Sequence, residues 1–198
     1  IISVSSAGVV GNGESISPSI SNNGRFVAFE SSATNLVPDD TNDVMDVFVH
    51  DRQTGITERI SVTGDGVQGN GASTLSHISA NGRYIVFKSE ADNLVPDVWG
   101  GTNIYLKDRT TEYLELISVT PTGGGDGCSS DPAVSDNGRY VAFYSCQKGY
   151  AGGATGGYFN VFVRDRWVAE TYLISVSLAG NPGNNHSWGR IGISGDGS

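Results

Sequence analysis

The sequence predicts an all-β fold in which one four-stranded unit is repeated, and three observations lead to this prediction. First, Asp51, Asp108 and Asp165, each followed by Arg, lie 57 residues apart. Second, an Asn-Gly pair precedes each predicted second strand, which is the strongest short hairpin signal and requires positive φ at both central residues of a tight turn. Third, the strands after these turns are apolar at consecutive positions. Repeats of this length are typical of propellers, solenoids and arrays.

Each repeat is predicted to contain four strands in a fixed order. The first strand ends at Ile20, Ile78 or Val134, and the Asn-Gly turn follows it. The second strand is the aromatic and apolar run after the turn, the third ends at Asp-Arg, and the fourth carries Ile-Ser-Val. Turn and second strand occupy 21–29, 79–87 and 135–143, third strands 46–52, 103–109 and 160–166, and fourth strands 60–63, 117–120 and 174–177. No segment has a convincing helical period.

Consecutive apolar residues in the second strands require burial on both faces of the sheet. An open sheet would leave one face in water, whereas a sheet packed between two similar sheets does not. This is the arrangement of a β-propeller, in which four-stranded blades pack face to face around an axis. We therefore expect one domain over residues 1–198 with three complete blades at about 15–63, 73–120 and 130–177. An orphan strand is expected at each end, over 1–5 and 189–194.

The elements Ser-x-Asn-Gly-Arg-Tyr-Val-Ala-Phe at 135–143 and Val-Phe-Val-x-Asp-Arg at 161–166 resemble bacterial TolB-like (WD-repeat-like) propeller repeats. In those repeats a Ser-Pro-Asp-Gly-like turn leads into an Ile-Ala-Phe strand, and this chain mostly has Asn-Gly where the family prefers Asp-Gly. The resemblance covers essentially the whole chain and implies the propeller fold. It implies little about chemistry, because the fold serves many functions.

Three blades and two orphan strands do not close a ring, since closed propellers have roughly four to eight blades. Two explanations stay open. The chain is a part of a longer protein, or several chains assemble into a homo-oligomer through their open blade edges.

The chain of 198 residues has a net charge of −9. This balance argues against nucleic acid as a partner, because phosphate contacts need a basic surface. It argues equally against an anionic membrane surface, and no apolar run is long enough to span a bilayer. A solvated surface explains the acidity, and cation binding is the alternative.

The two cysteines, Cys128 and Cys146, lie in the third repeat at equal distances from its hairpin turn. Residues at such positions face each other across the strand pair, so we expect a cross-strand disulfide, with two buried free thiols as the alternative. A disulfide implies an extracytoplasmic protein in the periplasm, at the cell surface or in the medium.

Two classes of connection are long and polar in every repeat. In an up-and-down blade both classes emerge on one face, here called the long-loop face, and binding residues concentrate on such loops. The second-to-third loops cover about 32–44, 89–101 and 146–158, and the inter-blade loops cover about 5–15, 64–73, 121–130 and 178–187. The loop aromatics Trp99, Tyr150, Tyr158 and Trp188 are candidate ligand-binding residues that could stack on sugar rings or anchor a peptide. The alternative is that they pack the loops onto the blades.

The most distinctive constellation is the acidic loop with Asp39, Asp40, Asn42, Asp43 and Asp46. Closely spaced Asp and Asn oxygens resemble a calcium loop, because Ca²⁺ prefers about six to eight hard oxygen ligands. The loop lacks the glycine and the distal Glu of an EF-hand. The alternative to calcium as a cofactor is an acidic turn in which Asp and Asn accept hydrogen bonds from local backbone N–H groups.

The sequence shows no recognisable catalytic constellation. The repeated Asp-Arg pairs are predicted to be structural, because a catalytic site is needed once and a blade corner is needed in every repeat. His50, His77 and His186 lack metal-ligand spacing, and no nucleophile elbow or phosphate loop occurs.

Three functions are therefore compatible with the sequence. The leading hypothesis is a non-enzymatic, extracytoplasmic propeller module that binds a protein or glycan through its long-loop face. The second is a self-assembling structural subunit of a surface layer or fibre. The third is the propeller domain of a larger hydrolase whose catalytic residues lie outside this chain.

Overall fold

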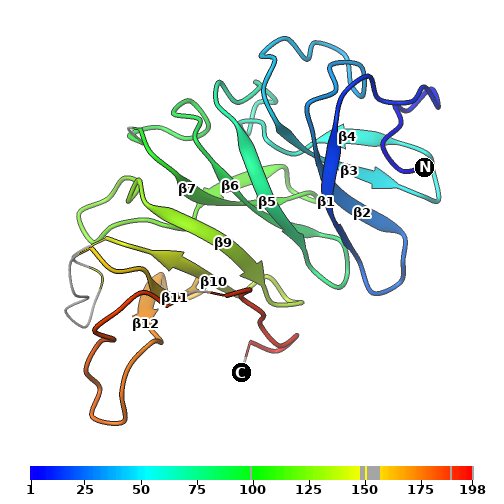
Figure 1. Ribbon diagram of the computed structural model, residues 1–198. Coiled ribbons are helices and arrows are strands. Elements are labelled where there is room, and N and C mark those ends of the chain that lie inside the picture. The colour runs from blue at the N-terminus through cyan, green and yellow to red at the C-terminus, as the bar shows by residue number, and fades with distance from the viewer. Residues whose placement is uncertain (99, 148–149, 151–156, 188, 198) are drawn as a thin grey trace.

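The computed structural model describes residues 1–98, 100–147, 150, 157–187 and 189–197. These residues form three antiparallel four-stranded sheets in which neighbouring strands follow each other in sequence. Figure 1 shows the sheets side by side in an arc. The predicted all-β fold with three four-stranded blades is confirmed. Blade 1 contains β1 (Ser15–Ile20), β2 (Phe26–Ser31), β3 (Asp46–Asp51) and β4 (Thr57–Arg59); blade 2 contains β5 (Ser73–Ile78), β6 (Tyr84–Ser89), β7 (Asn103–Asp108) and β8 (Tyr113–Leu116); blade 3 contains β9 (Ser129–Val134), β10 (Tyr140–Ser145), β11 (Asn160–Asp165) and β12 (Glu170–Leu173).

The blades pack face to face, and this buries both sides of the second strand in blade 2; in blade 1 the second side is covered by Leu36 and Ile2. In each blade an aromatic ring of the second strand stacks on one of the third, at centroid distances of 5.8 Å for Phe29 and Phe48 and 5.8 Å for Phe87 and Tyr105. One apolar cluster joins Ala28, Val49 and Ile60 of blade 1 to Ile85 and Phe87 of blade 2, and a second cluster joins blade 2 to blade 3 in the same way. Burial between blades explains the uninterrupted apolar runs. No helix in the described part of the chain is long and apolar enough to cross a membrane.

The hairpin turns differ from the predicted two-residue type. Gly24 has a φ of 69°, but Asn23 is not among the residues with positive φ. The loop contains four residues, because the Gly24 N–H donates to the Ser21 carbonyl at 2.8 Å and the Phe26 N–H donates to the Ser21 side-chain oxygen at 3.0 Å. The Asn23 side chain accepts from the Arg25 N–H at 3.0 Å. These contacts hold Asn23 in an ordinary conformation and leave only glycine at positive φ. The turns at 79–83 and 135–139 repeat the pattern.

The repeated Arg and Asp residues join the strands at the hairpin end of each blade. Arg25 donates through Nε and Nη2 to the Asp51 carboxylate at 2.9 and 2.7 Å. The same two-point contact joins Arg83 to Asp108 and Arg139 to Asp165. A second set of arginines links neighbouring blades through Arg109–Glu58 and Arg166–Glu115. The structural role predicted for the Asp-Arg pairs is confirmed.

The cysteines form the predicted disulfide in blade 3. The Cα atoms of Cys128 and Cys146 are 5.7 Å apart. The Cys146 N–H donates to the Cys128 carbonyl at 3.3 Å, so the two residues continue the hairpin ladder beyond β9 and β10. Backbone pairing therefore brings the two sulfur atoms together.

The predicted orphan segments lie in the expected places, but neither forms a regular strand. Within 1–5, Val4 forms a single bridge to Val10, which matches the bridge between Val62 and Gln68 after the fourth strand of blade 1. The described residues of 189–194 form no strand at all. A side chain at Gly197 would collide with the Tyr140 ring, as one at Gly82 would collide with Phe26. The C-terminal segment therefore occupies the position where a following blade would begin, without a second strand to pair with.

Candidate functional site

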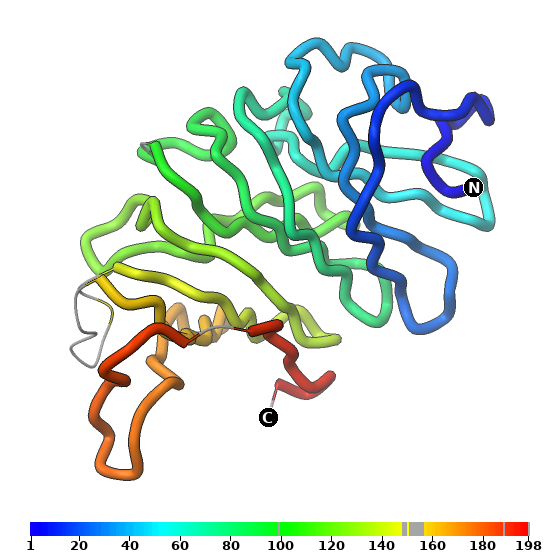
Figure 2. The backbone as a smooth tube through the Cα atoms, viewed as in Figure 1, coloured from blue at the N-terminus to red at the C-terminus, as the bar shows by residue number. Residues whose placement is uncertain are grey.

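The two classes of long loop contact each other at one end of the blades, as predicted. The Asn42 side chain donates to the Gly69 carbonyl at 2.9 Å, and the Asn70 side chain donates to Asp92 at 2.6 Å. Figure 2 shows the turns between first and second strands pointing to the lower right and these long loops lying at the opposite end. The long loops that the structure describes in blades 1 and 2 therefore share one face, the long-loop face.

Of the four predicted loop aromatics, the structure describes Tyr150 and Tyr158, and their surroundings differ. Trp99 and Trp188 lie outside the described residues. Tyr150 is 2% exposed, its ring lies 4.8 Å from that of Phe162, and its hydroxyl donates to Asp126 at 3.0 Å. The ring belongs to the apolar core of blade 3 and also lines a hollow beside Arg164, so its role in ligand binding stays a prediction. Tyr158 is 37% exposed and contacts His186 edge-on, so its role stays a prediction.

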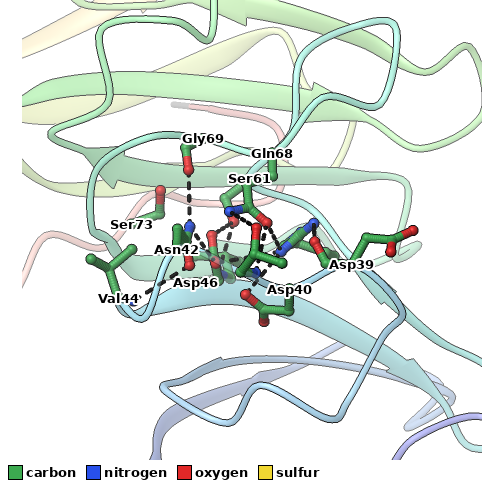
Figure 3. A network of polar contacts seen from close by, with 12 residues as sticks. Asp39, Asp40, Asn42, Val44, Asp46, Ser61, Gln68, Gly69 and Ser73 are labelled. Carbon is green, nitrogen blue, oxygen red and sulfur yellow. Dashed lines mark hydrogen bonds and ion pairs between the residues drawn. The ribbon is translucent and has the colours of Figure 1, made fainter.

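The acidic loop contains a buried ion-pair network (Figure 3). The Arg59 guanidinium lies 3.1 Å from the Asp40 carboxylate and 3.8 Å from that of Asp46. Asp46 also accepts hydrogen bonds from the side chains of Ser61 and Asn42. Arg59 donates in addition to the Asp39 carbonyl at 3.3 Å. Burial raises the pKa of Asp40 and of Asp46 above the ordinary aspartate value.

In this arrangement a guanidinium lies between the carboxylates, and calcium binding by the loop stays a prediction. No group of three or more His, Cys, Asp or Glu side chains in the described residues is arranged to hold a metal ion. The positive charge between Asp40 and Asp46 is the guanidinium of Arg59, and the oxygens of Asp46 already accept from Ser61 and Asn42. Calcium needs about six to eight oxygens around one point. The charge of Asp43 contributes to the raised pKa of Asp40.

Blade 2 has uncharged residues at these positions and keeps only the hydrogen bond from the serine. The positions of Asp40, Asp46 and Arg59 are taken there by Val98, Asn103 and Leu116. Strand register supports the comparison, because Arg59 pairs with Phe48 as Leu116 pairs with Tyr105. Ser118 donates to Asn103 as Ser61 donates to Asp46. The composition of the loop suggested calcium. The ion-pair network could have been predicted from another signal, because all three residues differ together between the first and the second repeat.

A second candidate site lies where the first strands of the blades meet. A hollow of about 400 Å³, here called the axial hollow, is lined by residues of all three first strands together with Glu30, Arg190 and Ile191. The first strands bulge here, and Ser17, Leu75 and Asp131 have φ values of 52°, 52° and 48°. Backbone strain of this kind is uncommon for residues other than glycine and concentrates at functional sites.

Three ionisable side chains of the axial hollow come from different blades. Glu30 is 2% exposed, accepts from the Ser76 N–H at 3.3 Å, and has a pKa that burial raises. The His77 Nδ1 atom is buried without a partner in the described structure, and burial lowers the pKa of its imidazole. Asp131 comes from β9. Together these groups offer hydrogen-bond acceptors and a neutral imidazole to a polar ligand.

Sequence reasoning missed the axial hollow. Glu30 occupies the position of Lys88 and Tyr144, and His77 that of Ser19 and Ala133. The available signal was this departure from the repeat at positions that face the axis.

Comparison with solved structures identifies the fold. TolB from Acinetobacter baumannii matches with a TM-score of 0.56 and 19% identity over 93% of this chain and 36% of that chain. A putative TolB from Agrobacterium tumefaciens matches with a TM-score of 0.51 and 17% identity over 80% of this chain and 49% of that chain. The fold is that of a TolB-like β-propeller. The chain spans less than half the length of these two propeller proteins.

The same fold occurs in enzymes. The tricorn protease matches with a TM-score of 0.52 and 17% identity over 89% of this chain and 14% of that chain. No protein-family profile and no curated protein matches the sequence.

Proposed function

We propose that this propeller is a non-enzymatic binding module whose partner is a protein that contacts the axial hollow and the adjoining long-loop face. The single observation that supports the proposal is the convergence of Glu30, His77 and Asp131 from three blades on a hollow of about 400 Å³. A concave site with a few convergent polar groups is the usual form of a binding site. Polar and charged groups suit a protein partner better than a sugar ring, which would need exposed aromatic rings, and Tyr150 is buried.

The test is selection of binders with immobilised protein from a random peptide library and from a panel of free glycans. Each hit is then measured against His77→Gln and Asp131→Asn, with Tyr158→Ala as a variant away from the hollow. A peptide that binds at least tenfold more weakly to both hollow variants supports the proposal. Glycan hits alone, or peptides that bind all variants equally, contradict it.

We further propose that the protein works outside the cytoplasm. The disulfide between Cys128 and Cys146 supports this, because such bonds persist in oxidising compartments. The measurement is alkylation of the natural protein under denaturing conditions, followed by its mass. Two alkylated cysteines would contradict the proposal, and an unmodified pair would agree with it.

Assembly through the open face of blade 3 is a second candidate function. Ile174 is 51% exposed there, whereas its equivalents Ile60 and Ile117 are 1% and 0% exposed because the next blade covers them. An apolar sheet face of this kind favours contact with another blade. Light scattering over a wide concentration range tests assembly, and a monomer at every concentration would exclude it. The role of propeller domain in a larger hydrolase is the third candidate, and the fold shared with enzymes such as the tricorn protease supports it.

A further inference from the structure

One position on the third strand carries a basic group in every blade. In blade 1 it is His50, whose Nδ1 lies 2.9 Å from the Thr57 hydroxyl. In blade 2 it is Lys107, which is 2% exposed. The Lys107 ammonium donates to the Glu112 carbonyl at 2.8 Å and lies 3.0 Å from the Glu112 carboxylate. The buried cation of blade 2 therefore has a carboxylate partner from the turn before β8.

Blade 3 keeps the cation and loses this carboxylate. Arg164 replaces Lys107, and Ala169 replaces Glu112 at a turn position with nearly the same φ, 57° against 59°. Arg164 Nη1 donates to the Ala169 carbonyl at 2.9 Å and to the Thr171 hydroxyl at 3.2 Å. The first of these contacts repeats the bond of Lys107 to the Glu112 carbonyl.

Arg164 lacks a carboxylate at ion-pair distance among the described residues. In the part of the chain that the structure describes, no carboxylate forms an ion pair with Arg164, and its Nε is buried without a hydrogen-bond partner. The nearby carboxylates of Asp165 and Glu115 are paired with Arg139 and Arg166. Burial lowers the pKa of Arg164. A half-buried cation without a partner is costly, and a bound anion would reduce that cost.

A hollow of about 490 Å³ lies beside this guanidinium. It is lined by Val119 and Pro121 after β8 and by Thr171 and Tyr172 of β12. In blade 2 the position of Thr171 is taken by Leu114, which is 5% exposed and fills the corresponding space. Blade 3 therefore has both a cation without its carboxylate and a space next to it that would admit a small organic molecule.

We propose that the hollow beside Arg164 binds a small monocarboxylate with an apolar or aromatic body, whose carboxylate replaces that of Glu112. Three other arginines of the chain bind carboxylates in the two-point manner that suits a planar guanidinium. Val119, Pro121 and the Tyr172 ring provide the apolar contacts for the body. Glu170 also lines the hollow, so a singly charged ligand is favoured over a doubly charged phosphate.

Benzoate and its neutral isostere benzamide test the proposal. We expect benzoate, titrated at millimolar concentrations, to shift the Nε–Hε signal of Arg164 in nitrogen-15 NMR and to raise the melting temperature. Benzamide should do neither. Sulfate at equal ionic strength controls for general anion effects.

Ala169→Glu is the decisive variant, because it restores the residue that blade 2 carries. We expect it to raise the melting temperature without ligand and to weaken benzoate binding at least tenfold. Arg164→Gln should also abolish the response, and Ala169→Glu keeps the test valid if that variant fails to fold. The proposal is overturned if benzoate does not shift the Arg164 signal of the wild type, or if benzamide or sulfate shifts it as much as benzoate does. It is also overturned if Ala169→Glu binds benzoate as tightly as the wild type.

Discussion

At the scale of single residues, the repeat shows that the same three positions of a blade accept either charged or uncharged residues. Asp40, Asp46 and Arg59 form a buried charged network in blade 1, where blade 2 has Val98, Asn103 and Leu116. In both blades the equivalent serine, Ser61 or Ser118, donates a hydrogen bond to the residue at the position of Asp46. Buried ion pairs are often no more stabilising than apolar residues of similar volume, but removing one partner is costly.

Exchanging these residues tests the network. We expect Arg59→Leu alone to lower the free energy of unfolding by about 3 kcal/mol, because it leaves two buried carboxylates without a cation. The triple variant Asp40→Val, Asp46→Asn and Arg59→Leu should recover most of that loss. Urea unfolding of the single and triple variants measures both values. A triple variant as unstable as the single one would show that the blades are not interchangeable here.

Calcium binding stays a prediction, and a melting temperature that rises with calcium in wild type would support it.

At the scale of strands, the Arg–Asp pairs fix the hairpin end of every blade. The hydrogen bonds from Arg83 hold the pKa of Asp108 down at about 2. An unfolded aspartate has a pKa of about 3.9. The contribution of the pair to stability is therefore complete above about pH 4 and is lost as the pH falls toward about 2. Burial raises the pKa values of Asp46 and Asp126, so the contribution of these two groups to stability increases as the pH falls.

The variant Asp108→Asn isolates this contribution. We expect it to lower the free energy of unfolding by about 1–3 kcal/mol at pH 7, since it removes two charge-assisted hydrogen bonds. The difference from wild type should shrink between about pH 4 and pH 2. Asp65→Asn, at an exposed loop carboxylate, is the matched control and should change little. A difference that is constant with pH would mean that the loss comes from packing and not from charge.

At the scale of the whole molecule, each blade covers the face of its neighbour, and the last face stays open. The equivalent isoleucines at the ends of the fourth strands show this, since Ile117 is 0% exposed and Ile174 is 51% exposed. The same residue type in the same strand position therefore has two environments. Its energetic contribution depends on the neighbouring blade.

A matched pair of truncations measures that dependence. Ile117→Ala should lower the free energy of unfolding by about 2–5 kcal/mol because it opens a cavity between blades 2 and 3. Ile174→Ala should change it by less than about 0.5 kcal/mol, because Ile174 is 51% exposed and no neighbouring blade packs on it. Chemical unfolding of dilute protein gives both numbers. An equally large loss at Ile174 would indicate that the face is covered in solution.

Much of the fold could be predicted because the repeat states the same information three times. The apolar second strands at 26–29, 84–87 and 140–143 predicted burial on both faces, and the equal spacing of Cys128 and Cys146 from their turn predicted the disulfide. The candidate site was less predictable. Composition suggested calcium for a loop in which Arg59, from another strand, supplies the positive charge. Tyr150 is a loop residue in the sequence and a core residue in the structure.

The sequence by itself determined the local pattern: four strands per repeat, the positions of the hairpin turns, and the face on which long loops gather. It could do so because backbone pairing and burial depend on neighbours that recur at fixed spacing. Only the tertiary structure decided which charges meet. Glu30 and His77 share the axial hollow, and Arg164 lies beside an open space, because blade packing brings together residues far apart in the sequence. Hydrogen bonds and ion pairs act over a few ångströms, so their partners are settled only once the blades are stacked.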